Sequence, residues 1–496
     1  MHLRDYQQLA LENIRNSFRN GNKKVLLVSP TGSGKTVIAS AMIQQATEKL
    51  KKCLFVAHRR ELVMQCSNKL HDFEVNHALL MAGKSGGYAR TTIASVQTFN
   101  ARKDNEYFMK PDADLIILDE AHRSVSKSFR DLVAEYPNAY VIGLTATPCR
   151  SDGKGLASMY DDLIECGSIR KLTDQGHLVP TRIVAPTMPD LEGIRIIGGD
   201  YEKGSLSERM NKPKLVGDLV THWLKFAEGR PTVVFCTSIA HSRYVAQIFR
   251  RNGIAAGHVD GDMPEIEREQ VLNDLHTGEI KVLANCQVLT EGWDEPKVSC
   301  VILARPTKSY AMYLQMVGRS LRPFEGKKDT LVIDHSGCVY EHGFPEDTPE
   351  WILTDGKVVD PKKKEPQPIE KQPFTCIKCQ AVYKPFKGAI ECPECGFAPT
   401  AQEKMVLIKQ GRLVELPKEK VTTNDKQNFY AQLVFHAKQK GYKEGWASWT
   451  FKEKFGHFPH TKRVHPMPMG EEVKGFLQHL RIKKAKSQGG AYVRRS

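Results

Sequence analysis

The segment from Leu26 to Thr36 places a glycine-rich turn directly after an apolar run. The sequence LLVSPTGSGKT is followed by apolar residues at helical spacing, so we expect the turn to join a strand to the start of a helix. In such a turn, backbone N–H groups can approach phosphate oxygens, Lys35 can neutralise the β- and γ-phosphates of a nucleotide, and the Thr36 hydroxyl can ligate Mg²⁺. Phosphate loops usually begin with glycine where this chain has Ser29. The strand–turn–helix setting is nevertheless retained, and a chance glycine turn is the weaker interpretation.

Two adjacent carboxylates follow a second apolar run. Asp119 and Glu120 come directly after the four apolar residues from Leu115 to Leu118. A buried parallel strand would carry both carboxylates to the C-terminal edge of its sheet, where ligands bind in open α/β proteins. Asp119 can hold Mg²⁺ through water, and Glu120 can orient or deprotonate an attacking water. The alternative is an acidic turn without a ligand, which the preceding phosphate-loop pattern disfavours.

A pair of arginines in the second half of the chain could act on the same nucleotide. Arg319 and Arg322 lie three residues apart in a segment with apolar helix spacing, which puts both guanidiniums on one helix face. Aimed across a cleft at a γ-phosphate, they would act as arginine fingers. Taken alone, the pair is better explained as surface arginine. However, the second half has no phosphate loop of its own, and one nucleotide held between two halves would need only one.

Four of the twelve cysteines form two C-x-x-C pairs separated by a short spacer with glycine and proline. Two such pairs can bring four thiolates into a tetrahedron that suits structural Zn²⁺. A redox pair is the weaker alternative, because no thioredoxin-like βαβ pattern surrounds them. The remaining cysteines are scattered in mostly apolar surroundings and are interpreted as small buried hydrophobes. The predicted zinc ligands are Cys376, Cys379, Cys392 and Cys395.

Two series of alternating strand and helix patterns must position these residues, and they predict an α/β fold with two tandem parallel sheets. Strand-like runs lie at residues 23–30, 52–58, 91–99, 140–148, 231–238, 280–289 and 298–306. Residues 179–193 are expected to be a linker between the two series. The predicted domains are a first lobe at 1–180, a second lobe at 181–345, a charged, proline-rich linker at 346–373, a zinc ribbon at 374–398 and a basic module at 399–496.

The C-terminal module carries most of the net charge. Residues 401–496 contain 20 Lys+Arg and 8 Asp+Glu, a balance of +12, against +15 for the whole chain. This favours a polyanion such as nucleic acid over a merely solvated lysine-rich surface. Helical spacing around Tyr430 and Leu433 predicts a small helical module whose aromatic residues mostly form its core. Residues 481–496 are predicted to be a flexible basic arm that raises nucleic-acid affinity in a salt-dependent manner.

Composition also limits the cellular setting. No stretch of 18 apolar residues is present, and the N-terminus lacks the apolar region of a signal peptide, so we expect a cytosolic protein without a membrane span.

Together these patterns resemble superfamily 2 helicases of the DEAH-containing group, which includes XPB-like and RadD-like DNA helicases and many phage helicases. The resemblance covers about residues 1–345. It rests on LRDYQ (3–7), SPTGSGKT (29–36), AHRRELVMQ (57–65), TIASVQTF (92–99), LDEAH (118–122), LTATP (144–148), VFCTS (234–238), VLTEGWDEP (288–296) and QMVGRSLRP (315–323), which are similar to the family's Q-type motif and its motifs I, Ia, the next nucleic-acid motif, II, III, IV, V and VI.

The resemblance implies two RecA-like lobes with ATP in the cleft and one nucleic-acid strand crossing both lobes. Residues expected at ATP and Mg²⁺ are Arg4, Gln7, Thr31, Gly32, Ser33, Gly34, Lys35, Thr36, Asp119, Glu120, Gly292, Asp294, Gln315, Arg319 and Arg322. His122 and Thr145 would couple this site to the nucleic-acid track. Backbone contacts that read no sequence would come from Arg60, Gln97, Thr98, Thr237 and Thr290.

The function expected from this resemblance is an ATP-dependent DNA helicase or translocase in replication, recombination or repair, in a bacterial or phage-infected cytosol. Its cofactors would be ATP, Mg²⁺ and Zn²⁺, and its partners would be single-stranded or branched DNA and a single-stranded-DNA-binding, replication or recombination protein. The alternatives are an RNA helicase, the motor of a restriction system whose nuclease lies on a partner subunit, and a nucleic-acid-binding scaffold with an inactive ATP site.

Overall fold

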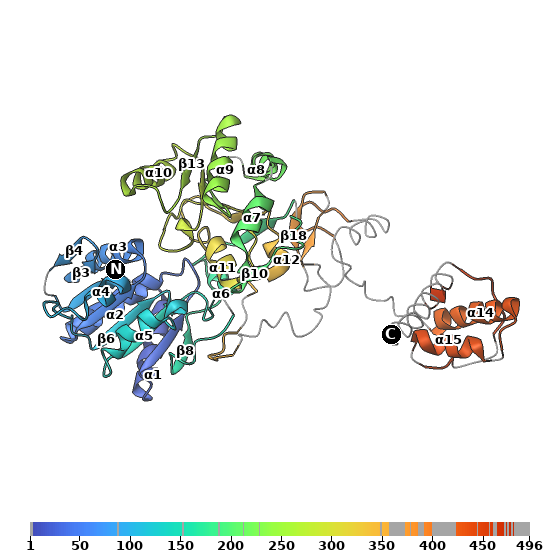
Figure 1. Cartoon of the computed structure of the whole chain (residues 1–496), viewed down its shortest axis with the longest axis horizontal. Helices are drawn as coiled ribbons and strands as arrows, with labels where there is room; N and C mark the ends of the chain where they lie inside the picture. Colours follow the sequence, from blue (N-terminus) through green and yellow to red (C-terminus); the bar gives the residue numbers. More distant parts are fainter. Residues whose placement is uncertain are drawn as a thin grey trace, which may run out of the picture. The chain divides into compact units, whose positions relative to one another are not determined.

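The chain divides into two compact units, residues 1–399 and residues 400–496 (Figure 1). The computed structural model describes residues 3–86, 89–150, 153–186, 189–211, 213–227, 229–347, 350–356, 373–376, 378–384, 391–398, 423–443, 445–455, 457–459, 464–470, 473, 476, 477 and 480.

The first unit begins with an eight-stranded sheet in the order β4-β3-β5-β2-β6-β7-β1-β8, parallel throughout except for the β3–β4 pair. The central strands are almost entirely apolar because helices cover both faces of a parallel sheet. The strands are β1 (Lys24–Val28), β2 (Cys53–Ala57), β3 (His77–Met81), β4 (Lys84–Gly86), β5 (Thr91–Ser95), β6 (Leu115–Asp119), β7 (Tyr140–Thr145) and β8 (Asp162–Glu165). The helices are α1 (Asp5–Arg19), α2 (Lys35–Glu48), α3 (Arg60–Asp72), α4 (Val96–Arg102), η1 (Ala121–Arg123) and α5 (Lys127–Ala134).

A second eight-stranded sheet follows, in the order β13-β14-β12-β15-β16-β9-β18-β17. Its strands are β9 (Thr181–Val184), β12 (Thr232–Phe235), β13 (Ala256–Val259), β14 (Val282–Asn285), β15 (Cys300–Leu303), β16 (Thr330–Asp334), β17 (Phe374–Thr375) and β18 (Ala381–Tyr383); β10 (Ile196–Ile197) and β11 (Asp200–Tyr201) form a separate hairpin. The helices are α6 (Ile169–Asp174), α7 (Lys203–Met210), α8 (Pro213–Phe226), α9 (Ile239–Arg251), α10 (Glu265–Thr277), η2 (Val288–Thr290), α11 (Tyr310–Gly318) and α12 (Cys338–His342). The two predicted parallel sheets are thus confirmed.

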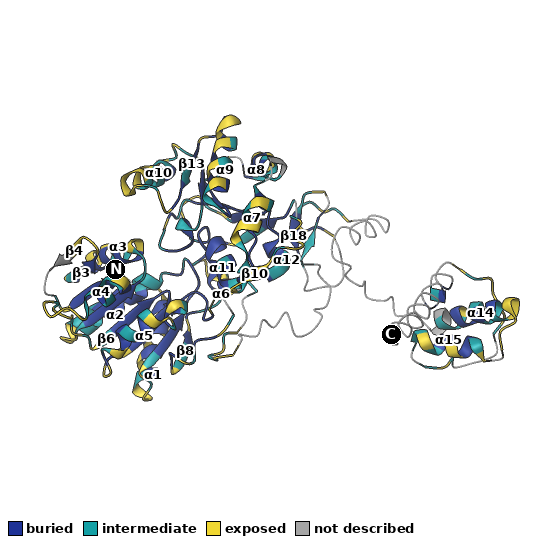
Figure 2. Cartoon of the chain, viewed as in Figure 1, coloured by how far each residue is buried: buried dark blue, intermediate teal, exposed yellow. Residues whose placement is uncertain are grey.

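The two lobes share one hydrophobic core cluster. This cluster contains Leu27 and Phe55 from the first sheet together with Val233 and Leu303 from the second. Two further clusters lie within one lobe each. They contain the buried side chains on the other face of each sheet. Figure 2 shows the buried sheets beneath more exposed helices. The lobes of the first unit are therefore joined by packed apolar side chains as well as by polar contacts.

The expected linker at 179–193 is wrong in part, because β9 occupies residues 181–184. This strand pairs parallel with β16, and its Ile183 and Val184 are buried. The β-branched residues Thr181, Ile183 and Val184 suit a strand. The second lobe thus begins with a strand of its own sheet.

Part of the expected linker at 346–373 also packs as ordered structure. The N–H of Trp351 donates to Glu165 Oε1 at 2.8 Å, and the N–H of Gly155 donates to the carbonyl of Gly356 at 2.9 Å. Trp351 and Leu353 pack against a core cluster of the first lobe. The chain therefore returns to the first lobe after completing most of the second. Residues 357–372 lie outside the described residues.

The second unit contains α14 (Thr423–Lys440) and α15 (Trp446–Phe455), which pack around Phe429, Leu433 and Phe451. Trp446 and Phe455 also pack against this core, as expected. In contrast, Trp449 is 65% exposed and Phe458 is 44% exposed. The predicted basic arm at 481–496 lies outside the described residues.

Among the helices described here, none combines the length and the apolar character needed to cross a membrane.

Candidate nucleotide site and lobe junction

The predicted phosphate loop connects β1 to α2, as its sequence indicated. Gly32 and Gly34 have φ angles of 89° and 86°, in the left-handed region that glycine tolerates best. Ser29 Oγ and Ser33 Oγ are 2.5 Å apart, and Lys35 Nζ donates to the Ser29 carbonyl at 3.3 Å. Ser29, which stands where phosphate loops usually have glycine, therefore contributes contacts within the loop.

The start of α1 supports the phosphate loop from one side. Tyr6 Oη donates to the Ser33 carbonyl at 2.6 Å, and Gln7 Nε2 donates to the same oxygen at 3.2 Å. A Cβ at Gly34 would lie 2.7 Å from Gln7 Nε2, the flexible end of that side chain, and the φ of 86° is the stronger reason for glycine here. The N–H of Arg4 donates to Gln7 Oε1 at 3.0 Å. Tyr6 was missed from sequence although it lies within the LRDYQ motif.

The two carboxylates of the LDEAH motif lie at the C-terminal end of β6. The N–H of Glu120 donates to Asp119 Oδ1 at 2.9 Å, and Glu120 has a left-handed φ of 48°. His122 Nδ1 lies 3.3 Å from Glu120 Oε2. Both carboxylates are buried, at 5% and 4% exposure. This places a histidine directly beside the candidate base.

The two carboxylates differ in their electrostatic surroundings. Burial, followed by the Glu120 charge, raises the pKa of Asp119, although Lys35 opposes the change. Burial also acts to raise the pKa of Glu120, but the neighbouring His122, 3.3 Å away, and the charge of Lys35 outweigh it and hold that pKa below its usual range. Burial lowers the pKa of the Lys35 ammonium, against the attraction of Glu120 and Asp119. Glu120 is therefore the carboxylate best kept ionised to accept a proton.

The chemistry of the donor set fits a hard divalent cation. Asp119 and Thr36, which lies in the first turn of α2, supply a carboxylate and a hydroxyl, the oxygen ligands that Mg²⁺ prefers. A cation would also offset the close approach of two buried carboxylates.

The start of the phosphate loop, directly after β1, is also hydrogen-bonded to β7. The N–H of Ser29 donates to the Thr145 carbonyl at 2.8 Å. Thr145 Oγ1 in turn donates to the carbonyl of Thr147 at 2.8 Å, and both threonines are fully buried. The LTATP motif thus holds the base of the phosphate loop.

The second lobe reaches the phosphate loop through the end of α11. A Cβ at Gly318 would lie 2.3 Å from Thr31 Cβ, which leaves no room for any other residue there. A Cβ at Gly32 would lie 3.2 Å from Arg322 Cγ. These contacts bring motif VI of one lobe directly against the phosphate loop of the other.

Both predicted arginine fingers are held near this contact. Arg319 Nη1 donates to the Trp293 carbonyl at 2.5 Å, and Arg322 is paired with Asp294. Burial lowers the pKa of Arg319, while the charges of Glu120 and Glu291 act to raise it, and burial lowers the pKa of Arg322 to about 10. Gln315 is buried within α11, which ends at Gly318. Arg319 caps this helix and Arg322 lies beyond it, so the prediction that both arginines share one helix face is wrong.

Motif V places its glycine against the first lobe. Gly292 has a φ of 76°, and a Cβ there would lie 3.2 Å from Leu62 Cγ of α3. The residue expected to contact nucleotide thus faces motif Ia.

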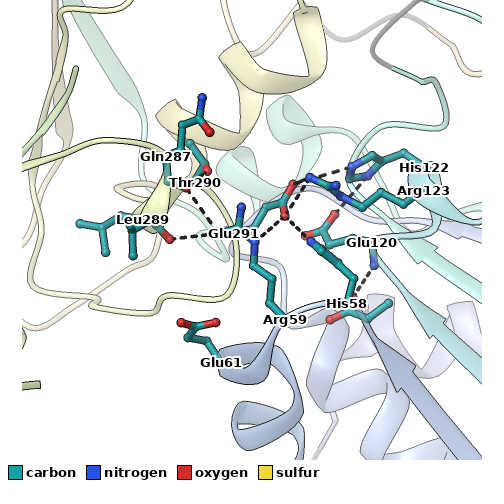
Figure 3. A network of polar contacts seen from close by, with 12 residues as sticks. His58, Arg59, Glu61, Glu120, His122, Arg123, Gln287, Leu289, Thr290 and Glu291 are labelled. Atoms are coloured by element: carbon teal, nitrogen blue, oxygen red, sulfur yellow. Dashed lines mark hydrogen bonds and ion pairs between the residues drawn. The ribbon is translucent and has the colours of Figure 1, made fainter. Parts of the chain in front are cut away.

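Next to Gly292, one carboxylate of the second lobe binds four basic side chains of the first; we call these five residues the junction network (Figure 3). The two oxygens of Glu291 accept from His58 Nε2 at 2.9 Å and from Arg123 Nη2 at 3.1 and 3.4 Å. Arg59 Nε and His122 Nε2 lie 3.3 and 3.8 Å away. Burial acts to raise the pKa of Glu291, but the hydrogen bond from His58 and the nearby arginines hold it well below its usual range. Sequence reasoning missed Glu291, because its partners are distant in the chain.

The predicted nucleic-acid residues of the first lobe border this network. Arg60, the first residue of α3, pairs with Glu265 of the second lobe at 3.1 Å. Gln97 Nε2 donates to the His58 carbonyl at 2.9 Å, and Thr98 is the next residue on α4.

Those of the second lobe are largely buried. Thr290, the residue before Glu291, donates from its Oγ1 to the Gln287 carbonyl at 2.7 Å. Thr237 Oγ1 lies 3.0 Å from His241 Nδ1, within its own lobe.

The four clustered cysteines converge at the far edge of the second sheet. Their sulfur atoms all lie within 4.8 Å of one another, with Cys376 and Cys395 3.6 Å apart and Cys379 and Cys392 also 3.6 Å apart. A tetrahedral site with Zn–S bonds of about 2.3 Å has S–S edges of about 3.8 Å, so the arrangement fits zinc. β18 pairs antiparallel with β9, so this ribbon extends the sheet of the second lobe.

Residues 1–150 match the family described as "Type III restriction enzyme, res subunit", and residues 211–323 match the "Helicase conserved C-terminal domain". A 51.5 kDa protein of a Lactococcus phage (isolate 7-9) is 32% identical over 402 residues, which make up 80% of this chain and 83% of the phage protein. IRC3 of Saccharomyces cerevisiae, provisionally named as an ATP-dependent helicase, is 32% identical over 359 residues, or 68% of this chain and 52% of the yeast protein. The chain thus spans about half the length of its yeast relative.

A solved fragment from Vibrio vulnificus YJ016, provisionally assigned as the HsdR subunit of a type I restriction enzyme, is similar in fold. The superposition has a TM-score of 0.53 and 24% sequence identity, and it covers 70% of this chain and 68% of the fragment. The matched families, the phage relative and the two RecA-like lobes agree: the chain belongs to the superfamily 2 helicases of the restriction-enzyme res and helicase C-terminal type, with an added four-cysteine cluster.

Proposed function

We propose that this protein is an ATP-driven DNA helicase or translocase of the XPB-like and RadD-like group that works in replication, recombination or repair. The observation that carries the proposal is the contact of both halves of an ATPase site across the lobe junction. Lys35, Asp119 and Glu120 come from the first lobe, and Arg319 and Arg322, which follow α11, come from the second. A non-catalytic scaffold would have no need to retain this set.

Each part of the site has a role in phosphoryl transfer to water. Lys35 would neutralise the β- and γ-phosphates, Thr36 and Asp119 would hold Mg²⁺, and Glu120 would accept a proton from the attacking water. Bound Mg²⁺ would supply charge neutralisation between the phosphates. Tyr6 and Gln7 keep the phosphate loop in position through the Ser33 carbonyl.

The second lobe completes the site with positive charge. Arg319 and Arg322 stabilise negative charge that develops on the transferred phosphate, and their contacts with Trp293 and Asp294 hold them at the junction. Residues assigned to nucleotide binding from the remaining motif positions are Arg4, Thr31, Gly32, Ser33, Gly34, Gly292, Asp294 and Gln315.

Nucleic acid would bind along both lobes near the junction network. The assigned contacts are Arg60, Gln97, Thr98, Thr237 and Thr290. The family that matches residues 1–150 is described as a subunit of a restriction enzyme. Because restriction enzymes act on DNA, DNA is favoured over RNA. The basic second unit, with the arm at 481–496, would add affinity that falls as salt rises.

The four cysteines are proposed to hold one structural Zn²⁺. No other group of three or more metal-binding side chains was found among the described residues. Four thiols this close together, two of them buried, repel one another when ionised, and a bound cation would remove that repulsion. Its place in the sheet of the second lobe supports a structural role.

The test is ATP turnover without nucleic acid and with single-stranded, duplex or forked DNA or single-stranded RNA, at one salt concentration. Strong stimulation by DNA alone supports the proposal, and Lys35→Ala is the control for contaminating ATPase. Greater stimulation by RNA would replace it with RNA remodelling. No stimulation by any of these would favour the scaffold.

The family description also favours a second candidate, the motor of a restriction-type system. Such a motor would be stimulated most by duplex DNA and would displace a bound triplex-forming strand without separating the duplex. Unwinding of a forked substrate by the purified chain would count against it.

A further inference from the structure

One buried carboxylate of the second lobe is shared by four basic side chains of the first. Glu291 is 4% exposed and lies between η2 and the left-handed Gly292. Its partners come from two separate segments of the first lobe: His58 and Arg59, directly before α3, and His122 and Arg123, directly after the LDEAH carboxylates (Figure 3).

The charges in this network balance only when the lobes are together. Arg59 and Arg123 each carry a fixed positive charge beside Glu291, at 3.3 and 3.1 Å. Without that carboxylate, two like charges would lose the anion that they share, although both arginine side chains keep some solvent exposure, 28% for Arg59 and 44% for Arg123. Arg59 Nη1 also lies 3.4 Å from the carbonyls of Gln287 and Val288. The geometry therefore couples the closed arrangement of the lobes to one side chain.

The network reaches the candidate base through a single residue. His122 lies between the two carboxylates, with Nδ1 3.3 Å from Glu120 Oε2 and Nε2 3.8 Å from Glu291 Oε1. Because η1 is a three-residue turn, contacts made by Arg123 also fix the position of His122. Glu120 has a backbone in the left-handed region, so it depends on its surroundings to hold its conformation.

The same network borders the proposed nucleic-acid track on both lobes. Gln97 donates to the His58 carbonyl at 2.9 Å, Arg60 follows Arg59, and Thr290 precedes Glu291. A nucleic-acid strand that contacts these residues would touch both lobes beside the junction network at the same time.

We propose that Glu291 is a positioning residue that joins nucleic-acid binding to hydrolysis. Nucleic acid bound across both lobes holds Glu291 against His58, Arg59 and Arg123, and His122 is thereby kept beside Glu120 in the geometry that accepts a proton from water. This inference rests on the proposed function and assigns its regulation to one interlobe carboxylate. A purely structural ion pair would instead support folding without affecting stimulation.

The experiment compares full-length wild type with Glu291→Gln, which keeps side-chain size but removes the charge. ATP turnover is measured with no nucleic acid and with a saturating amount of the DNA that best stimulates wild type, and kcat and KM for ATP are obtained separately. We expect DNA-stimulated kcat to fall about tenfold, while basal kcat and KM for ATP change less than about twofold, a coupling within the usual allosteric range.

The matched control is Glu265→Gln. Glu265 also pairs across the junction with an arginine of motif Ia, but its side chain is 58% exposed. An exposed pair of this kind contributes little, so stimulation should stay within about twofold of wild type. A thermal melt of each variant establishes whether folding is intact.

A second variant keeps the inference testable if Glu291→Gln does not fold. Arg123 is 44% exposed in its side chain, so Arg123→Gln should fold, and it should lower stimulated kcat in the same direction. If both variants fold, the double variant should lose little more than Glu291→Gln alone, because the two act through one contact.

Two results would overturn the inference: unchanged stimulation in Glu291→Gln and Arg123→Gln, or an equal loss of basal and stimulated turnover. Absence of DNA stimulation in wild type would instead contradict the proposed function itself. Rescue of part of the stimulation by Glu291→Asp would further separate a charge effect from a packing effect.

Discussion

The junction network and the four-cysteine cluster are both buried groups of polar side chains, but they offset the cost of burial in different ways. In the junction network, a carboxylate from one lobe is neutralised by basic groups from the other. In the cluster, four like groups lie together, with Cys376 and Cys392 only 1% exposed, in an arrangement compatible with a bound cation. A neutralisation shared between lobes can be made and broken as the lobes move, whereas one supplied by a bound ion is permanent. The first arrangement suits a motor, and the second suits a structural anchor.

The largest expected effect is on the chemical step next to the junction. Glu120→Gln should reduce ATP turnover by about 10²–10⁴-fold, because a general base is lost while the side chain keeps its size. ATP binding, measured with a fluorescent analogue, should persist. A turnover within a few-fold of wild type would assign the base elsewhere.

Removing one cysteine of the four-cysteine cluster should affect the cluster without affecting the junction network. Cys392→Ser should reduce zinc content from about one per chain to nearly none, because three thiolates bind the ion much more weakly. Limited proteolysis should then cut near β17 and β18, while basal ATP turnover changes less than about threefold. Atomic absorption on the purified chain measures the first effect. A fully active, metal-free wild-type chain would contradict a structural zinc site.

A smaller effect is expected at the support of the phosphate loop. Tyr6→Phe removes one buried hydrogen bond to the Ser33 carbonyl, worth about 0.5–1.5 kcal/mol, so KM for ATP should rise about two- to tenfold with little change in kcat. Steady-state kinetics test this split. A change in kcat alone would indicate that Tyr6 acts on the junction rather than on loop position.

The smallest effect sharpens the distinction between buried and exposed pairs. Glu61→Gln breaks an exposed ion pair with Arg268 across the same junction, and stimulated turnover should change by less than about twofold. A loss as large as that expected for Glu291→Gln would mean that any interlobe charge, rather than the buried network, governs stimulation.

Several functional groups could be predicted because they are local in sequence. The glycine turn before Lys35, the carboxylates after an apolar strand and the two C-x-x-C pairs each bring their chemistry together within a few residues or across a short spacer. The two parallel sheets followed from alternating patterns for the same reason. Strand β9 fell within the predicted linker, because a strand of only four residues carries little periodic signal.

Other features depend on residues that meet only in the folded chain. Trp351 and its neighbours occupy a segment that resembles a linker in composition, yet they pack on the first lobe because apolar surface there remains uncovered. Tyr6 gains its role only when α1 lies against the phosphate loop.

By itself, the sequence determined the nucleotide chemistry, the family and the candidate metal ligands, because those depend on residue types at short, regular spacings. Only the tertiary structure decided that Glu291 would meet His58, Arg59, His122 and Arg123. Glu291 lies 233 residues after His58 and 168 residues after Arg123, and nothing in their local spacing records the contact. Burial of opposite charges at a junction is a property of two packed lobes, and it exists only once both have folded against each other.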